Sequence, residues 1–354
     1  MKRFLLFTFA VFILLYGLER LLSDRQSAQR NLASRLRPFP GSEELTVEEV
    51  KSLRISQSQS STAWIYRFSD DAWHYPAYHN AFAQSDKINP LLESILKSLG
   101  TVKSVAAEEA SRFGFGSKTS LAIELGDSTG KSRLKLEVGH AVPGRDTGES
   151  YMRSADSDTI YHMHGDPYRS LKWNPAAVRP PMIDPFVLPR ALNRRAIVIV
   201  RFRASKYPLR TLRRVLVEPE ESEGRSPLDG PTTEWRGEFE SGEQKVYNPS
   251  GFAFTNYLSR LKYEDLHDPE SPDIYGFSGA KWIILEDEDS VVDTLDVGGK
   301  SEQGNVYLRH RTTGQVLSVK AHKADLLFPT QALLITLLEE TPYQTAEPTG
   351  QFGF

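Results

Sequence analysis

The chain has 354 residues, a length that predicts about two domains. Its 43 lysines and arginines are matched by 46 aspartates and glutamates, so the sequence lacks the strong positive field that a nucleic-acid partner requires. The absence of cysteine excludes disulfides, thiolate metal sites and cysteine nucleophiles, and no motif predicts a cofactor.

The N-terminus predicts a membrane anchor at residues 1–22. Lys2 and Arg3 precede an uncharged apolar run from Phe4 to Leu18, and Leu21 and Leu22 extend it toward the ~20 residues of a spanning helix. Bulky and charged residues follow instead of small ones, so we expect no signal-peptide cleavage. The apolar residues that define the anchor are Phe4, Leu5, Leu6, Phe9, Phe12, Ile13, Leu14 and Leu15.

Two signals disagree on which side of the membrane the body lies. The arginines after the apolar run outnumber the basic residues before it, which favours a cytoplasmic body under the positive-inside rule. A basic head followed by an apolar run is, in contrast, the order of an export signal. We expect export, with residues 23–44 as a polar linker that contains Pro38, Pro40 and Gly41.

The body contains two stretches that are similar to each other. Thr62–Tyr75 and Thr233–Tyr247 each open with Thr-x-Trp, at Trp64 and Trp235, and continue with alternating apolar residues that predict hairpin strands. An apolar stripe at helical spacing follows in each half, after Asn89 and Pro90 in the first, which we expect to begin that helix. The stripes are Leu92, Ile95, Leu96 and Leu99, and then Phe254, Tyr257, Leu258 and Leu261.

The likeness continues through a set of glycine and tyrosine motifs. An aromatic-Gly-Phe turn precedes a strand in each half, a second strand ends in Val-Gly, and a third carries Tyr-x-Arg. The offset between halves shrinks steadily from 171 at the Trp pair to 156 at the Tyr pair, with every loss in a polar connection. Duplication predicts this pattern. The shared residues are Trp64, Gly114, Gly139 and Tyr151, and then Trp235, Gly276, Gly298 and Tyr307.

These elements predict an α+β protein with two tandem repeats, each a mainly antiparallel sheet with one covering helix. We assign residues 45–185 to the first repeat and 207–340 to the second, which ends in an amphipathic helix near Thr330–Glu340. An apolar run at Ala196–Val200 predicts a connecting strand within residues 186–206. Residues 341–354 are expected to form a flexible tail.

The motifs resemble a bacterial family known as domain of unknown function 4340. The resemblance rests on the apolar N-terminus, the strand at Trp64–Tyr66, the Leu-rich helix, and the motifs at Phe113–Phe115, Leu136–Gly139 and Tyr151–Arg153. That family is similar to subunits of gliding-motility-type ABC exporters and is often encoded beside them. The resemblance implies a single-pass accessory protein on the outer side of the bacterial inner membrane, with ABC permease or auxiliary subunits as partners and no catalytic residue.

One motif favours a different function. His162, His164 and Asp166 match the first part of the H-x-H-x-D pattern of binuclear metallohydrolases, and two imidazoles two residues apart on a strand share one face. Pro167 stands where that pattern needs another ligand, so a face without metal is the simpler interpretation. An extracytoplasmic metal-dependent hydrolase, and a free-standing envelope scaffold that binds glycan or protein, stay open as alternatives to a non-enzymatic accessory subunit.

The remaining charged and glycine-rich motifs are weaker. Lys118 is displaced from the position that a phosphate-binding loop requires, and the acidic run Glu286–Asp289 lacks calcium-ligand spacing. Nine basic residues between Arg190 and Arg214 occur without an intervening acid, which predicts either a surface for an anionic partner or ion pairing with the acidic stretch Glu218–Glu243.

Overall fold

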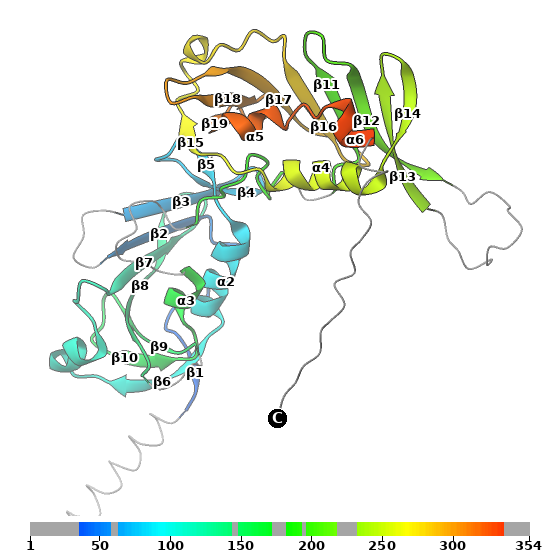
Figure 1. The fold of residues 1–354 in the computed structure, drawn as a ribbon. Helices are drawn as coiled ribbons and strands as arrows, with labels where there is room; N and C mark the ends of the chain where they lie inside the picture. Colours follow the sequence, from blue (N-terminus) through cyan, green and yellow to red (C-terminus); the bar gives the residue numbers. More distant parts are fainter. Residues whose placement is uncertain are drawn as a thin grey trace, which may run out of the picture. The chain divides into compact units, whose positions relative to one another are not determined.

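The computed structural model describes residues 35–57, 63–143, 148–171, 182–192, 196–217 and 232–335. They form two compact units (Figure 1). Unit 1 contains the described residues up to Ala77 and those from Phe82 to Ile183, and unit 2 contains Tyr78–Ala81 and the described residues from Asp184 onward. Each unit combines an antiparallel sheet with a few helices, which confirms the predicted α+β class.

In the described residues the sheet of unit 1 has ten strands, in the order β1-β6-β10-β9-β8-β7-β2-β3-β4-β5. In the longer strands apolar and polar residues alternate, so that every second side chain faces the core, whereas all four residues of β4 are buried. The strands are β1 (Arg37–Pro38), β2 (Ser52–Gln57), β3 (Ala63–Ser69), β4 (Ala72–Tyr75), β5 (Ala81–Phe82), β6 (Leu99–Ser104), β7 (Leu121–Gly126), β8 (Ser132–Ala141), β9 (Ser150–Ser154) and β10 (Ile160–Met163).

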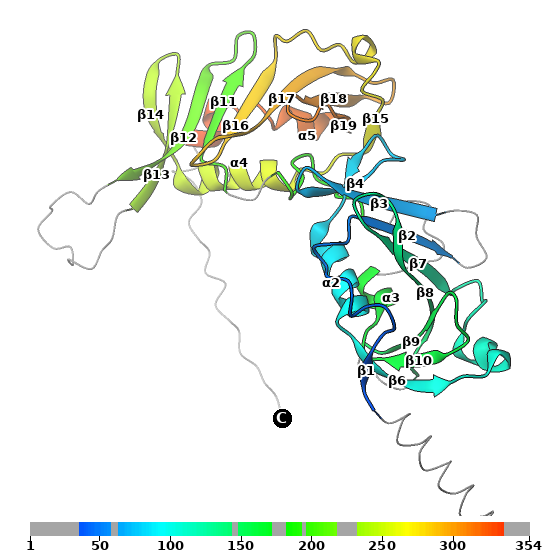
Figure 2. The same ribbon diagram turned by 180° about the vertical axis from the view of Figure 1, so that it is seen from behind.

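Helix α2 (Ser85–Leu96) corrects our prediction at both ends. It begins at Ser85 rather than beside Asn89, with Pro90 inside it, because Ile88 adds a further turn to the buried stripe. It stops at Leu96, and Leu99 belongs to β6 and is 43% exposed. The 3₁₀ helix η1 (Ala107–Phe113) and helix α3 (Pro167–Leu171) complete unit 1, and α2 and α3 lie side by side in both views (Figures 1 and 2).

Strand β1 lies inside the segment that we expected to be a linker. Arg37 and Pro38 pair with Gly100 and Leu99 of β6. The adjacent Phe39 is fully buried, with its ring centroid 5.7 Å from that of Tyr161. Burial of this aromatic side chain places the start of unit 1 before Leu45.

In the described residues the sheet of unit 2 has nine strands, in the order β14-β13-β12-β11-β16-β17-β18-β19-β15. Strand β11 contains part of the predicted connecting run, but it is an interior strand between β12 and β16, because Val200 and Phe202 face the core. The strands are β11 (Ile199–Arg203), β12 (Leu209–Val217), β13 (Thr232–Phe239), β14 (Gly242–Val246), β15 (Asp265–His267), β16 (Trp282–Glu286), β17 (Val291–Lys300), β18 (Asn305–His310) and β19 (Val316–Lys320).

Helix α4 (Asn248–Arg260) has Pro249 in its first turn, where a missing N–H costs no helical hydrogen bond, and it contains the predicted apolar residues Phe254, Tyr257 and Leu258. Unit 2 also contains the 3₁₀ helix η2 (Pro272–Tyr275) and the short helices α5 (Ala321–Asp325) and α6 (Gln331–Ile335). Helix α4 packs against β13 and α6. Helix α6 is the described part of the predicted C-terminal helix.

The predicted membrane anchor at residues 1–22 and the predicted tail at residues 341–354 lie outside the described residues. In the part of the chain that the structure describes, no helix has both the length and the apolar character needed to cross a membrane.

Candidate functional site

In unit 1 the residues singled out by sequence comparison meet around one turn. Gly114 ends η1 in the left-handed conformation, at φ 86°, which a side chain would strain. Gly139 on β8 lies against this turn so closely that a Cβ atom there would be 2.1 Å from the Phe113 carbonyl oxygen. The Phe113 ring packs on Tyr151 of β9, with centroids 4.7 Å apart. The motif residues therefore hold the turn against the sheet.

The same contacts recur in unit 2. Gly276 ends η2 at φ 67°, and a Cβ atom on Gly298 would be 2.3 Å from the Tyr275 carbonyl oxygen. The rings of Tyr275 and Tyr307 are 4.8 Å apart. All six glycine and tyrosine positions of the predicted signature thus have packing roles.

An acid–arginine pair supports the turn in unit 1, and our sequence analysis missed it. Arg153 donates to Glu137 Oε2 from Nε at 2.9 Å and from Nη2 at 2.7 Å. The guanidinium carbon of Arg153 is also 4.9 Å from the ring centroid of Phe115. The pair occupies facing positions on β8 and β9. It joins the strands to the aromatic turn by charge and by a cation–π contact.

Unit 2 has the corresponding pair with a second arginine added. Arg309 donates to Asp296 Oδ2 at 2.7 Å, and Arg311 donates to Oδ1 at 2.6 Å. Burial raises the pKa of Asp296, but the hydrogen bonds from Arg311 and Arg309 outweigh it and hold that pKa below its ordinary value. Arg309 also lies over Phe277, 4.7 Å from the ring centroid.

The predicted metal candidates are only partly brought together. His162 Nε2 lies 2.8 Å from Glu149 Oε2, and His164 Nδ1 lies 3.0 Å from Glu149 Oε1. Asp166 instead accepts the backbone N–H groups of Tyr168 and Arg169 at the start of α3. Among the described residues, no group of three or more His, Asp or Glu side chains is arranged to hold a metal ion. Glu149, from a polar loop, carries no local sequence signal.

Unit 2 contains a second histidine–carboxylate cluster in its core. His310 and Asp293 are 1% and 0% exposed, and His310 Nδ1 is hydrogen-bonded to Asp293 Oδ2. The Thr312 hydroxyl donates to the other oxygen, Oδ1, at 2.8 Å. Since both residues bond to the carboxylate and not to each other, the arrangement lacks the hydroxyl–imidazole contact that activates a nucleophile. Burial raises the pKa of Asp293, but the hydrogen bond to His310 leads the contacts that bring it below its ordinary value.

Three of the basic residues in the run between Arg190 and Arg214 form ion pairs. Arg201 donates to Glu286 at 2.6 Å, Arg213 to Glu243 at 2.8 Å and Arg214 to Glu288 at 3.0 Å. Only Glu243 belongs to the acidic stretch Glu218–Glu243 that we expected to pair with these arginines, whereas Glu286 and Glu288 lie in the later run Glu286–Asp289.

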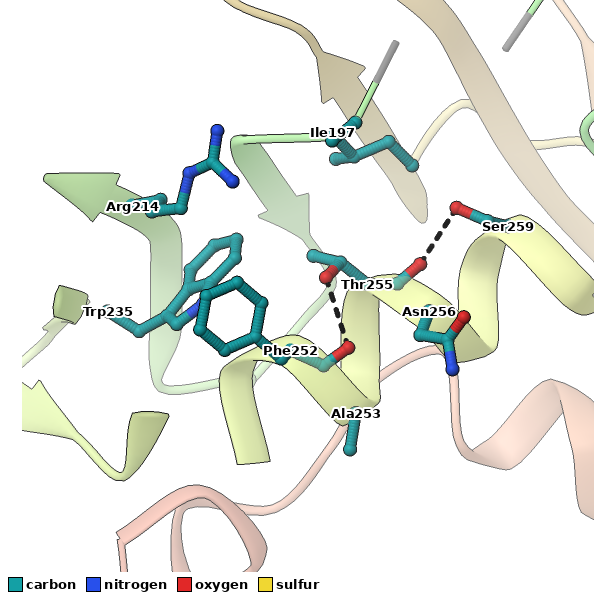
Figure 3. A pocket seen from close by; sticks show the side chains of 9 residues that line it. Ile197, Arg214, Trp235, Phe252, Ala253, Thr255, Asn256 and Ser259 are labelled. Carbon is teal, nitrogen blue, oxygen red and sulfur yellow. Dashed lines mark hydrogen bonds between the residues drawn. The ribbon is translucent and has the colours of Figure 1, made fainter. Parts of the chain in front are cut away.

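An open hollow of about 450 Å³ lies beside α4 in unit 2 (Figure 3). Trp235, one of the two tryptophans shared by the sequence halves, lines this hollow. Trp235 is fully buried on β13, and its ring presses on the helix so closely that a Cβ atom at Gly251 would be 2.3 Å from it. Phe252 packs edge-on against Trp235 and stays 43% exposed. Figure 3 shows Arg214 above the two rings and Asn256 further along the helix. Trp64, the counterpart in the first sequence half, is 8% exposed on β3.

These observations define a two-sheet α+β protein whose buried polar clusters brace its own turns. The chain belongs to the family described as Domain of unknown function (DUF4340), whose model matches residues 73–279, more than half of the chain. A comparison with curated proteins finds no match.

Proposed function

We propose that this protein is a non-catalytic accessory subunit of an ABC-type export system, anchored in the bacterial inner membrane by residues 1–22. Its body lies on the extracytoplasmic side and acts by binding other proteins. The chain belongs to the family known as domain of unknown function 4340, and the resemblance to that family implies an accessory subunit of an ABC exporter, which supports the proposal. The apolar run Phe4–Leu18 supports the anchor.

The main support for a non-catalytic role is that the buried carboxylates are bonded to other groups of the protein. Among the described residues these are Glu149, Asp184, Asp293 and Asp296. Two histidines contact the first, backbone N–H groups donate to the second, and His310 or arginines bond to the others. A general base needs a lone pair that faces its substrate, and these contacts leave the carboxylates braced within the fold.

We also propose that the two units are copies of one module. The order of elements supports this: each has a hairpin, a helix, a short strand, a 3₁₀ turn and then four antiparallel strands. The contacts between the aromatic turn, the glycine strand and the acid–arginine pair support it too. In the described residues unit 2 then has one additional interior strand, β11, and unit 1 has the additional short strands β1 and β5.

The test is to isolate the full chain from membranes in a mild detergent and identify its companions by mass spectrometry. We expect a permease or ATP-binding subunit in near-stoichiometric amount, and not in a matched preparation of an unrelated single-pass protein. Repeated absence of any transporter subunit would favour the free-standing scaffold instead. Alkaline phosphatase fused after Phe354 should be active, and an inactive but expressed fusion would place the body in the cytoplasm.

A further inference from the structure

The hollow beside α4 contains a buried donor without a partner. The Nε1–H group of Trp235 has no hydrogen-bond acceptor among the described residues, although its backbone N–H donates to the Asn248 side chain at 2.8 Å. An unpaired buried N–H group is unfavourable, so such groups are normally bonded to protein, water or a ligand. The indole side chain lines the hollow, where an incoming acceptor would relieve this deficit.

A second, apolar hollow of about 240 Å³ lies between α4, α5 and α6. Leu326 and Leu333 line it and are 44% and 45% exposed. Ala253 lines both hollows, so they flank the same exposed stretch of α4. Together with Phe252, these side chains place apolar surface on either side of one helix, an arrangement typical of a protein-binding surface.

The charge of this surface is one-sided. Among the described residues that line the two hollows, none is acidic and Arg214 is the single charged one. Its ion pair with Glu288 is a surface contact, since Glu288 is 72% exposed, and such pairs are weak and easily exchanged. A partner that is both apolar and acidic therefore complements the surface. Tryptophan and arginine are also among the residue types that dominate binding energy at interfaces.

We propose that α4 and its two hollows, the α4 surface, dock an apolar and acidic segment of a partner protein. In this complex the exposed Phe252 ring shifts toward a bulky apolar side chain of the partner. This movement uncovers the buried Nε1–H of Trp235, so that a carbonyl or carboxylate oxygen can accept from it. An acidic side chain pairs with Arg214. The inference rests on the proposed function in one respect, because it assigns the surface by which the subunit binds its partner.

The first test is photocrosslinking in cells with the full chain. The photoreactive residue p-benzoylphenylalanine is placed at position 252 and, as a matched control, at position 65, where Ile65 is 36% exposed on unit 1. We expect position 252 to give one dominant crosslink to another protein, within a peptide that contains bulky apolar and acidic residues. No crosslink beyond that at position 65, or crosslinks only to a second copy of this chain or to lipid, overturns the proposal.

The second test measures affinity with the crosslinked peptide as the synthetic probe. Trp235→Phe keeps a ring but removes the N–H group, and we expect about fivefold to tenfold weaker binding, the range for one hydrogen bond. Phe252→Ala should weaken binding more than about tenfold, while Ile65→Ala stays within about twofold. Circular dichroism and gel filtration check that each variant folds. If folded Trp235→Phe binds as tightly as the native chain, the indole N–H has no role in docking.

Failure of this inference is separable from failure of the proposed function. If transporter subunits co-purify with the full chain but position 252 gives no crosslink, the docking surface lies elsewhere and the accessory function stands. If position 252 crosslinks strongly to a protein that is not part of a transporter, the α4 surface stands and the exporter assignment fails.

Discussion

The close approach of Gly298 to the turn at Tyr275 gives the sharpest test of how unit 2 holds together. Replacement by alanine adds one methyl group to β17, within the β-bulge between Val297 and Lys300. Because the backbone φ of Gly298 is not positive, the change tests steric proximity and not left-handed strain. We expect Gly298→Ala to separate the turn from the strand that supports it.

The size of the effect follows from the geometry. The added Cβ would lie 2.3 Å from the Tyr275 carbonyl oxygen and 2.9 Å from the Phe277 ring. Strand and turn must therefore separate by roughly 0.7 Å to reach even the 3.0 Å below which Cβ contacts essentially never occur. Overpacking costs about 1–3 kcal/mol, and since the obstacle is a backbone atom we expect about 2–3 kcal/mol of lost unfolding free energy.

Hydrogen exchange read by mass spectrometry resolves this loss segment by segment in the full chain. Peptides from β16 and β17 should exchange about 30-fold faster or more at that cost, while peptides from β7 and β8 stay unchanged. Gly299→Ala is the matched control, because a Cβ there would meet the same carbonyl oxygen at an ordinary 3.6 Å. We expect it to change exchange by less than about threefold.

The reasoning is refuted if the adjacent variants behave alike. Equal protection in Gly298→Ala and Gly299→Ala would mean that the turn moves freely, so the glycine contact does not brace the sheet. Faster exchange in both units after Gly298→Ala would mean global loss of structure rather than release of one turn.

Three further predictions follow from the same contacts. Gly139→Ala should raise exchange of β8 in unit 1 and leave unit 2 unchanged, because its Cβ would lie 2.1 Å from the Phe113 carbonyl oxygen; uniform exchange across both units would contradict this. The lowered pKa of Asp296 contributes stability that is complete above the ordinary value of about 3.9 and is lost as pH falls through its folded pKa. Asp296→Asn should therefore reduce unit 2 stability at pH 7 and flatten its acid unfolding limb below about pH 4, and an unchanged limb would refute the assignment. Elemental analysis of the purified full chain should find less than about 0.1 zinc, manganese or iron per molecule, whereas stoichiometric metal would revive the hydrolase alternative at His162 and His164.

Local pattern explains what the sequence predicted well. Alternating apolar residues around Trp64 and Trp235 predicted the hairpins β3–β4 and β13–β14, and both form. Gly114 and Gly276 were expected to allow a turn before a strand, and both adopt positive φ. In each case the signal lies within a few residues of its consequence, because strand alternation and glycine backbone freedom are local properties.

The errors arose where a distant partner decides the structure. Helix α2 begins early because Ile88 finds a buried place on the core, although Asn89-Pro90 looks like a good local start. Strand β1 forms because β6, some sixty residues later, offers it an edge. Glu149 meets His162 across a loop, and no spacing rule links them. In contrast, the acid–arginine pairs could have been predicted from the sequence, since an acidic residue precedes each Val-Gly and an arginine follows each Tyr-x.

If the two units are copies, their differences locate function more sharply than their likenesses. The shared contacts around Gly139 and Gly298 are explained by folding alone, so they place no constraint on a partner. Among the described residues, unit 1 has a histidine pair on Glu149, and unit 2 has an unpaired indole N–H at the α4 surface. The first of these is internally hydrogen-bonded, whereas the second leaves a donor without an acceptor and apolar side chains partly exposed among the described residues. Because binding energy comes from groups that the free protein leaves unsatisfied, the α4 surface is where a partner gains most from docking.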